Sequence, residues 1–156
     1  CNPSGSVYSR EELTALAKVL EKYPNIYVVA DEIYEHINFS GTFCSIGSIP
    51  GMLEKTVTVN GVAKAFAMTG YRIGYIGAPE FIAKACTKIQ GQVTSGANSV
   101  AQRATITAVD ADPSVLNHMV QAFHSRRDLV VGLLKEIPGV KINVPEGAFY
   151  VLHIGA

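Results

Sequence analysis

The sequence contains no tryptophan, no excess of charge of either sign and no long apolar run. Its 13 basic and 13 acidic side chains cancel and do not cluster, which argues against nucleic acid or an anionic membrane surface as a partner. The apolar runs fall far short of the roughly 20 residues that cross a bilayer, so no membrane span is predicted. The three cysteines and four histidines lack the spacing of a metal or redox site. We therefore expect reduced thiols, no metal and a cytoplasmic protein.

The composition is that of a folded domain, with 48% hydrophobic and 17% charged residues. Ser9 and Glu12 form a capping box, which predicts a helix that ends before Pro24. Residues 26–30 are continuously apolar and rich in β-branched side chains, which predicts an interior parallel strand covered on both faces. Further elements are predicted as strands at residues 56–59 and 72–76 and helices at residues 79–88 and 99–109. This alternation predicts an α/β layered sheet.

Asp112 and Pro113 predict the start of a long helix that runs to Ile137. The spacing of the apolar residues along this helix predicts a buried apolar stripe, which Arg127 interrupts. The stripe consists of Leu116, Val120, Phe123, Val130, Leu134 and Ile137. Two more strands are predicted at residues 140–144 and 149–154. We accordingly divide the chain into residues 1–112, a connecting helix at 113–138, and the beginning of another domain at 139–156.

Polar side chains lie at the positions where an open parallel sheet binds its ligands, just beyond the carboxyl ends of strands. Asp31 directly follows the apolar strand, where a helix end or an internal ion pair could equally explain it. Lys64 lies among apolar neighbours, a setting that suits a Schiff-base lysine, although a lone lysine is more often a surface residue. Arg72 lies between two glycines, where a guanidinium could bind a phosphate with two parallel hydrogen bonds. The stretch at residues 2–5, taken alone, is a turn.

Four motifs, taken in order, resemble the class I and II pyridoxal-phosphate aminotransferases of fold type I, in particular the bacterial aspartate aminotransferases. They are Asn-Pro-Ser-Gly at residues 2–5, Asp-Glu-Ile-Tyr at 31–34, Lys-Ala-Phe-Ala-Met-Thr-Gly-Tyr-Arg-Ile-Gly-Tyr at 64–75 and Pro-Glu-Gly-Ala-Phe-Tyr at 145–150. The block at residues 64–75 is the most specific of the four. The resemblance covers nearly all 156 residues.

The resemblance implies part of a three-layer α/β/α large domain of a pyridoxal-phosphate transferase, then a connecting helix and the start of a small domain. It implies pyridoxal 5′-phosphate as cofactor, an amino acid and a 2-oxo acid as substrates, and a homodimer. The amino donor would be aspartate-like. No nucleic acid or membrane partner is expected.

The resemblance also implies a role for five residues. Lys64 would bind the cofactor covalently and move the proton at the substrate α-carbon. Asp31 would pair with the pyridine nitrogen and keep the ring protonated. Tyr34 and Asn2 would hydrogen-bond the phenolic oxygen, with the Asn2-Pro3 peptide bond in the cis form. Arg72 would bind the phosphate.

Other interpretations stay open at this point. The same fold could carry a C–S lyase reaction, or the chain could be an aminotransferase-like sensing domain of a transcription regulator. The sequence departs from many relatives at Gly61 and Ala63, where they carry serine, and this removes one expected phosphate donor. The ring-stacking aromatic and the arginine that binds the substrate carboxylate are not found in it. We therefore expect a piece of a longer chain, inactive by itself.

Overall fold

The computed structural model describes residues 1–155 and divides the chain into two compact units, each described here by itself. Unit 1 comprises Cys1–Val7, Tyr34–Phe43 and the residues from Asp112 onward, and unit 2 comprises Tyr8–Ile33 and Cys44–Ala111. Among the described residues, no helix has the length and apolar character needed to span a membrane. The division of the chain at residues 112 and 138 stays a prediction.

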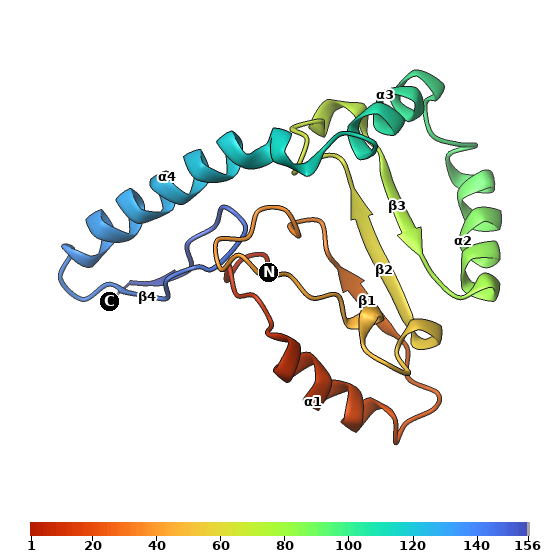
Figure 1. Ribbon diagram of the computed structural model, residues 1–156, viewed down its shortest axis with the longest axis horizontal. Helices are drawn as coiled ribbons and strands as arrows, with labels where there is room; N and C mark the ends of the chain where they lie inside the picture. Colours follow the sequence, from red (N-terminus) through yellow and green to blue (C-terminus); the bar gives the residue numbers. More distant parts are fainter. Residues whose placement is uncertain (156) are drawn as a thin grey trace. The chain divides into compact units, whose positions relative to one another are not determined.

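Unit 2 is built on a three-stranded sheet in the order β1-β2-β3 (Figure 1). β1 (Val28–Asp31) is parallel to β2 (Thr56–Gly61), and β2 is antiparallel to β3 (Gly74–Gly77). The strand expected at residues 72–76 is therefore present but begins at Gly74. Arg72 adopts a left-handed backbone conformation, with φ 55° and ψ 43°, which no regular strand accommodates.

One face of β1 packs on the core of unit 2. Helix α1 (Arg10–Leu20) has the predicted capping box: the Ser9 hydroxyl accepts from the Glu12 backbone N–H at 3.1 Å, and the Glu12 carboxylate accepts from the Ser9 N–H at 2.8 Å. The helix packs against Val28 and Ala30 together with η1 (Ile46–Ser48) and the residues that connect it to a second short 3₁₀ helix, η2 (Leu53–Lys55). The buried side chains of this core are Leu13, Ala17, Ile46, Ile49 and Met52.

The described residues leave the other face of β1 uncovered, so the prediction of a strand buried on both faces is wrong. Val29, which alternates with Val28 and Ala30, is 71% exposed, and Ile26 just before the strand is 45% exposed. Within residues 1–155, β1 pairs only with β2. An apolar, β-branched run predicts a strand, but it does not specify which elements cover each face.

The two helices that follow the sheet agree closely with the sequence. α3 (Ser99–Val109) has the predicted bounds and is capped by Asn98, whose side chain accepts from the Ala101 N–H at 3.0 Å. α2 (Glu80–Val93) follows Pro79 as expected but continues five residues beyond Lys88. Figure 1 shows α1 and α2 flanking the strands from opposite sides.

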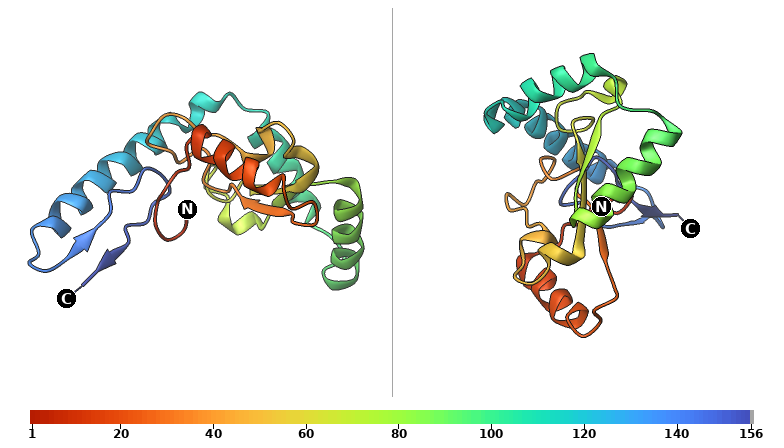
Figure 2. Two further views of the ribbon diagram at one scale, coloured as in Figure 1. Left: turned by 90° about the horizontal axis from the view of Figure 1, so that it is seen from below. Right: turned by 90° about the vertical axis from the view of Figure 1, so that its right-hand side faces the viewer.

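Unit 1 contains the predicted long helix and the two C-terminal strands. A 3₁₀ turn, η4 (Pro113–Leu116), leads into α4 (Asn117–Lys135), and β4 (Lys141–Ile142) pairs antiparallel with β5 (His153–Ile154) beside this helix (Figure 2). Both strands are shorter than predicted. Hydrogen bonds from the side chain and backbone of Ser114 lower the pKa of Asp112, which caps η4.

The stripe predicted along α4 is buried only in part. Leu116 is buried and Leu134 is half-buried, whereas Val130 and Ile137 are 41% and 49% exposed, so the prediction is wrong for these last two residues. Arg127 contacts two other segments of unit 1. Its guanidinium carbon lies 5.1 Å from the ring centroid of Phe39, and its Nη1 donates to the Pro145 carbonyl. The arginine that interrupts the stripe thus joins three segments of unit 1.

The N-terminal segment of unit 1 is tied to residues 145–148 through Gly5. The Gly5 carbonyl accepts from the backbone N–H groups of Glu146 and Gly147, both at 2.9 Å. Gly5 has φ +69°, and a Cβ atom there would overlap the Pro145 Cβ. Only glycine fits both the backbone conformation and this close approach.

We expect Gly5→Ala to lower the free energy of unfolding by about 2–4 kcal/mol, the sum of a left-handed backbone penalty and overpacking against Pro145. Gly41→Ala is a matched control, because Gly41 has φ +80° but nothing within 4 Å of the added Cβ. Its effect should be about 1 kcal/mol. Thermal or denaturant unfolding of the two variants checks the difference, and equal destabilisation would contradict the steric argument.

Candidate active site

Asp31 ends β1 at the edge of the sheet where β2 also ends. The parallel register aligns Asp31 with Val59, and the Glu32 N–H continues the ladder by donating to the Val59 carbonyl at 2.9 Å. The Asp31 side chain is exposed and accepts a hydrogen bond from the Ile33 N–H at 3.3 Å. The turn therefore orients the carboxylate and leaves one oxygen able to accept from a ligand.

Lys64 lies in the loop that follows β2 at this edge. The neighbouring Val62 and Ala65 are 0% and 3% exposed, and Lys64 between them is half-buried. The backbone turns sharply here: the Phe66 N–H donates to the Val62 carbonyl at 3.3 Å and the Ala67 N–H to the Lys64 carbonyl at 3.2 Å. Two buried apolar side chains thus fix the backbone that carries the amine.

Arg72 ends the same loop. Gly61 of β2 pairs with Gly74 of β3, so this strand pair closes residues 62–73 into a loop with its base at the sheet edge. A Cβ on Gly61 would lie 2.8 Å from the Ile73 carbonyl oxygen, so the base of the loop requires glycine. Arg72 is exposed, and its Nη1 donates to the Thr69 carbonyl at 3.0 Å, which leaves other guanidinium N–H groups for an anion.

Three of the predicted residues therefore lie at one edge of the unit 2 sheet: the carboxylate of Asp31, the amine of Lys64 and the guanidinium of Arg72. Their order along the chain and the strand register explain the arrangement. The chemistry of this set suits a ligand with one protonated nitrogen, one electrophilic carbon and one phosphate. That the three side chains share a single cleft stays a prediction.

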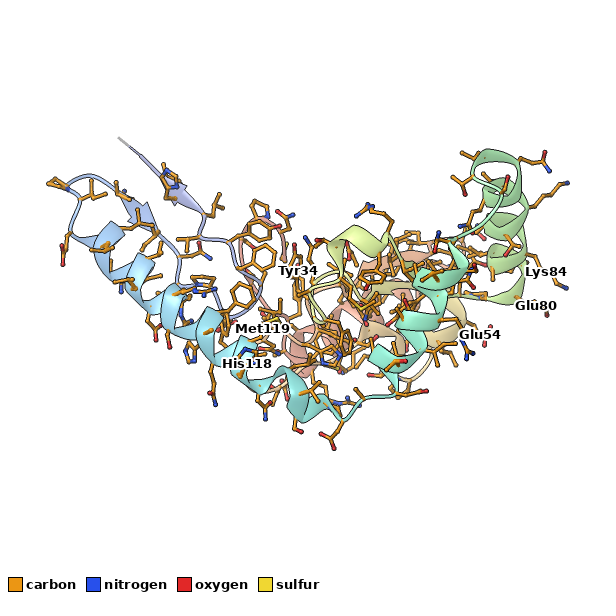
Figure 3. All side chains as sticks on the ribbon, turned by 90° about the horizontal axis from the view of Figure 1, so that it is seen from above. Tyr34, Glu54, Glu80, Lys84, His118 and Met119 are labelled. Carbon is orange, nitrogen blue, oxygen red and sulfur yellow. The ribbon has the colours of Figure 1, made fainter. Side chains whose placement is uncertain are left out.

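The other two predicted residues, Asn2 and Tyr34, belong to unit 1, where Tyr150 links them. The Tyr34 and Tyr150 hydroxyl oxygens are 2.7 Å apart, and Asn2 Nδ2 donates to the Tyr150 hydroxyl at 3.2 Å. Tyr34 is half-buried and labelled in Figure 3. The Asn2-Pro3 peptide bond is cis, which confirms the prediction.

Tyr150 is the site residue that the sequence reasoning missed. It ends the Pro-Glu-Gly-Ala-Phe-Tyr motif, which carried part of the resemblance without any role for its tyrosine. Its partners are 116 and 148 residues away in the sequence, so no local pattern could reveal them.

Comparison with known proteins assigns this chain to a family. The family described as aminotransferase class I and II matches residues 1–156. The chain belongs to this family. A Petunia hybrida protein named bifunctional aspartate aminotransferase and glutamate/aspartate-prephenate aminotransferase is 48% identical over 154 residues, which cover 96% of this chain and 32% of that protein. An aspartate/prephenate aminotransferase from Nitrosomonas europaea is 48% identical over 151 residues, covering 96% of this chain and 38% of its own.

The fold of this aminotransferase-family chain agrees with a solved structure. The crystal structure of the aspartate aminotransferase from Rhizobium meliloti superposes with a TM-score of 0.94 at 42% identity, covering 97% of this chain and 38% of that one. The predicted α/β fold, part of a pyridoxal-phosphate transferase domain, is thereby confirmed. The chain spans about a third of the length of the relatives that it matches.

Proposed function

We propose that the protein transfers an amino group between an aspartate-like amino acid and a 2-oxo acid with pyridoxal 5′-phosphate as cofactor. The observation that carries the proposal is the carboxylate, amine and guanidinium of Asp31, Lys64 and Arg72 at one sheet edge. The names of the relatives support aspartate as donor and include prephenate as an acceptor. They favour amino transfer over a C–S lyase reaction or a sensing role.

The residues present fit this cofactor. Asp31 would accept a hydrogen bond from the protonated ring nitrogen, and Arg72 would bind the phosphate. The glycines at the base of the loop would allow the phosphate to come close to the backbone. Lys64 would hold the cofactor covalently and, once displaced by the substrate amine, would take the proton from the substrate α-carbon. When bound, pyridoxal phosphate supplies an electron sink for the pair left at that carbon.

The proposal is tested with the protein expressed from its complete gene and loaded with pyridoxal phosphate. Aspartate and 2-oxoglutarate should yield oxaloacetate and glutamate in equal amounts, and prephenate should be compared with 2-oxoglutarate as acceptor. Cystathionine serves as the lyase control, with release of a thiol and a 2-oxo acid as the readout. Thiol release without glutamate formation, or cofactor binding without turnover, would contradict the proposal.

We further propose that the active form is a homodimer, as the family resemblance implies. Several large apolar side chains of α2 and α3 are exposed in this chain: Phe81, Ile89, Val93 and Val100 are between 60% and 75% exposed. Exposed apolar surface of this kind is typical of a face that another chain or segment covers. Light scattering of the purified protein gives its molar mass directly.

A further inference from the structure

We propose that Tyr150 is a positioning residue for the cofactor: its hydroxyl holds Asn2 in place and orients the Tyr34 hydroxyl so that Tyr34 donates its proton outward, to the phenolic oxygen of the cofactor. The inference rests on the proposed function, because it assigns Tyr34 to that oxygen. It adds a residue that touches neither the substrate nor the reacting atoms.

The number of protons limits the direction of the hydrogen bonds in the cluster formed by Asn2, Tyr150 and Tyr34. The Asn2 amide nitrogen can only donate, so the Tyr150 oxygen accepts at this 3.2 Å contact. Tyr150 has one proton of its own, and its other hydroxyl neighbour is Tyr34, at 2.7 Å. If Tyr150 donates to Tyr34, the two hydrogen bonds run in one direction, from Asn2 to Tyr150 and from Tyr150 to Tyr34. The Tyr34 proton is then directed to a further acceptor.

A hydrogen-bond chain of this direction strengthens its last donor. Each donor is polarised by the bond that its own oxygen accepts, so the Tyr34 hydroxyl becomes a better donor than an isolated phenol. Hydrogen bonds to an anionic phenolic oxygen stabilise the anion. Tyr150 therefore acts on the cofactor through Tyr34, and removal of its hydroxyl should weaken one bond without deleting it.

The position of Tyr150 is fixed by packing and by backbone hydrogen bonds. Its ring packs edge-to-face on Tyr34, with centroids 5.7 Å apart, and lies 4.9 Å from the ring of Phe149. Just upstream, the Ala148 N–H donates to the Ile37 carbonyl at 2.8 Å. The segment that carries Tyr150 is thus joined to the segment that carries Tyr34, and Phe in place of Tyr150 would keep these ring contacts.

The charged groups near Tyr150 stay unchanged in the Tyr150→Phe variant. Arg126, Arg127 and His153 line the same hollow of unit 1 as Tyr150. Glu35 and His36, which follow Tyr34 directly in the sequence, pair with each other at 3.3 Å. Tyr150→Phe removes none of them, so a change in cofactor behaviour reports the loss of the hydroxyl.

The test compares Tyr150→Phe, Tyr34→Phe and the double variant in the protein from the complete gene, loaded with pyridoxal phosphate. The readout is the pH midpoint of the visible absorbance change of the bound cofactor. Tyr150→Phe should raise the midpoint by roughly half a pH unit to one unit, and Tyr34→Phe should raise it further. In the double variant, the additional effect of Tyr150→Phe should be smaller than in the unaltered protein, because the part that acts through Tyr34 is then lost.

Tyr8→Phe is the matched control, since Tyr8 is 63% exposed and lies in unit 2. A Tyr150→Phe midpoint equal to that of this control, or fully additive effects in the double variant, would overturn the inference while leaving the proposed function intact. Wild-type protein that binds no pyridoxal phosphate would overturn both. The thermal unfolding midpoint of each variant without cofactor excludes a general loss of structure as the cause.

Discussion

Lys64→Arg is expected to abolish amino transfer in the protein expressed from its complete gene, with a loss of at least about 10⁴-fold in turnover. Arginine keeps the positive charge and much of the side-chain length, but a guanidinium is not deprotonated in proteins and cannot act as nucleophile or base. The buried neighbours Val62 and Ala65 hold the loop backbone in either variant, so the fold should persist. The variant should therefore separate chemistry from structure.

The measurement has two parts. Steady-state production of oxaloacetate from aspartate gives turnover, and borohydride treatment followed by peptide mass spectrometry locates the covalently bound cofactor. The modified residue should be Lys64 in the unaltered protein. Lys84→Arg is the control, since Lys84 is exposed on α2 and forms an ion pair with Glu80 at 2.6 Å (Figure 3). Modification at a different lysine would show that the assignment of Lys64 is wrong.

Asp31→Asn should lower turnover by at least about 10²–10³-fold, the scale for loss of a preorganised electrostatic partner. The neutral amide cannot keep the ring nitrogen protonated, so electrons released at the substrate α-carbon are less well stabilised. The folded structure should tolerate the change, because Asp31 is exposed and an amide oxygen can equally accept the hydrogen bond from the Ile33 N–H. Cofactor should remain bound through Lys64.

The turnover number and the visible absorbance of the bound cofactor check this prediction together. Asp110→Asn is the control, since Asp110 is an exposed residue at the C-terminal end of α3. Asp31→Glu should recover part of the activity, because the carboxylate is retained but displaced. Near-normal turnover in Asp31→Asn would exclude the role proposed for this carboxylate.

Local signals in the sequence predicted local structure well. The Ser9 and Glu12 capping box and the bounds of α3 are confirmed, because each depends on contacts within a few residues. The burial of Val29, Val130 and Ile137 was predicted wrongly, because burial depends on elements that cover a face, and the periodicity of a segment does not name them. The left-handed conformation of Arg72 could not be predicted from the residue type.

The positions of the candidate site residues were likewise predictable only in part. Asp31 and Lys64 follow strands, and a parallel pairing of those strands was enough to bring them to one edge of the sheet. Arg72 reaches that edge because β3 pairs antiparallel with β2, with Gly74 opposite Gly61. The sequence did not specify this antiparallel pairing. The contact of Tyr150 with Tyr34 spans 116 residues and became visible only in three dimensions.

The hydrogen bonds between Gly5 and residues 146 and 147 also constrain the order of events on the ribosome. At about 5–20 residues per second, roughly 7–28 s separate the synthesis of Gly5 from that of Gly147. β1 and β2 of unit 2 can pair much earlier, because 28 residues separate Val28 from its partner Thr56. The segment that carries Gly5 must therefore wait, without these hydrogen-bond partners, until residues 146 and 147 have been synthesised, and it is exposed to proteases and chaperones during that interval.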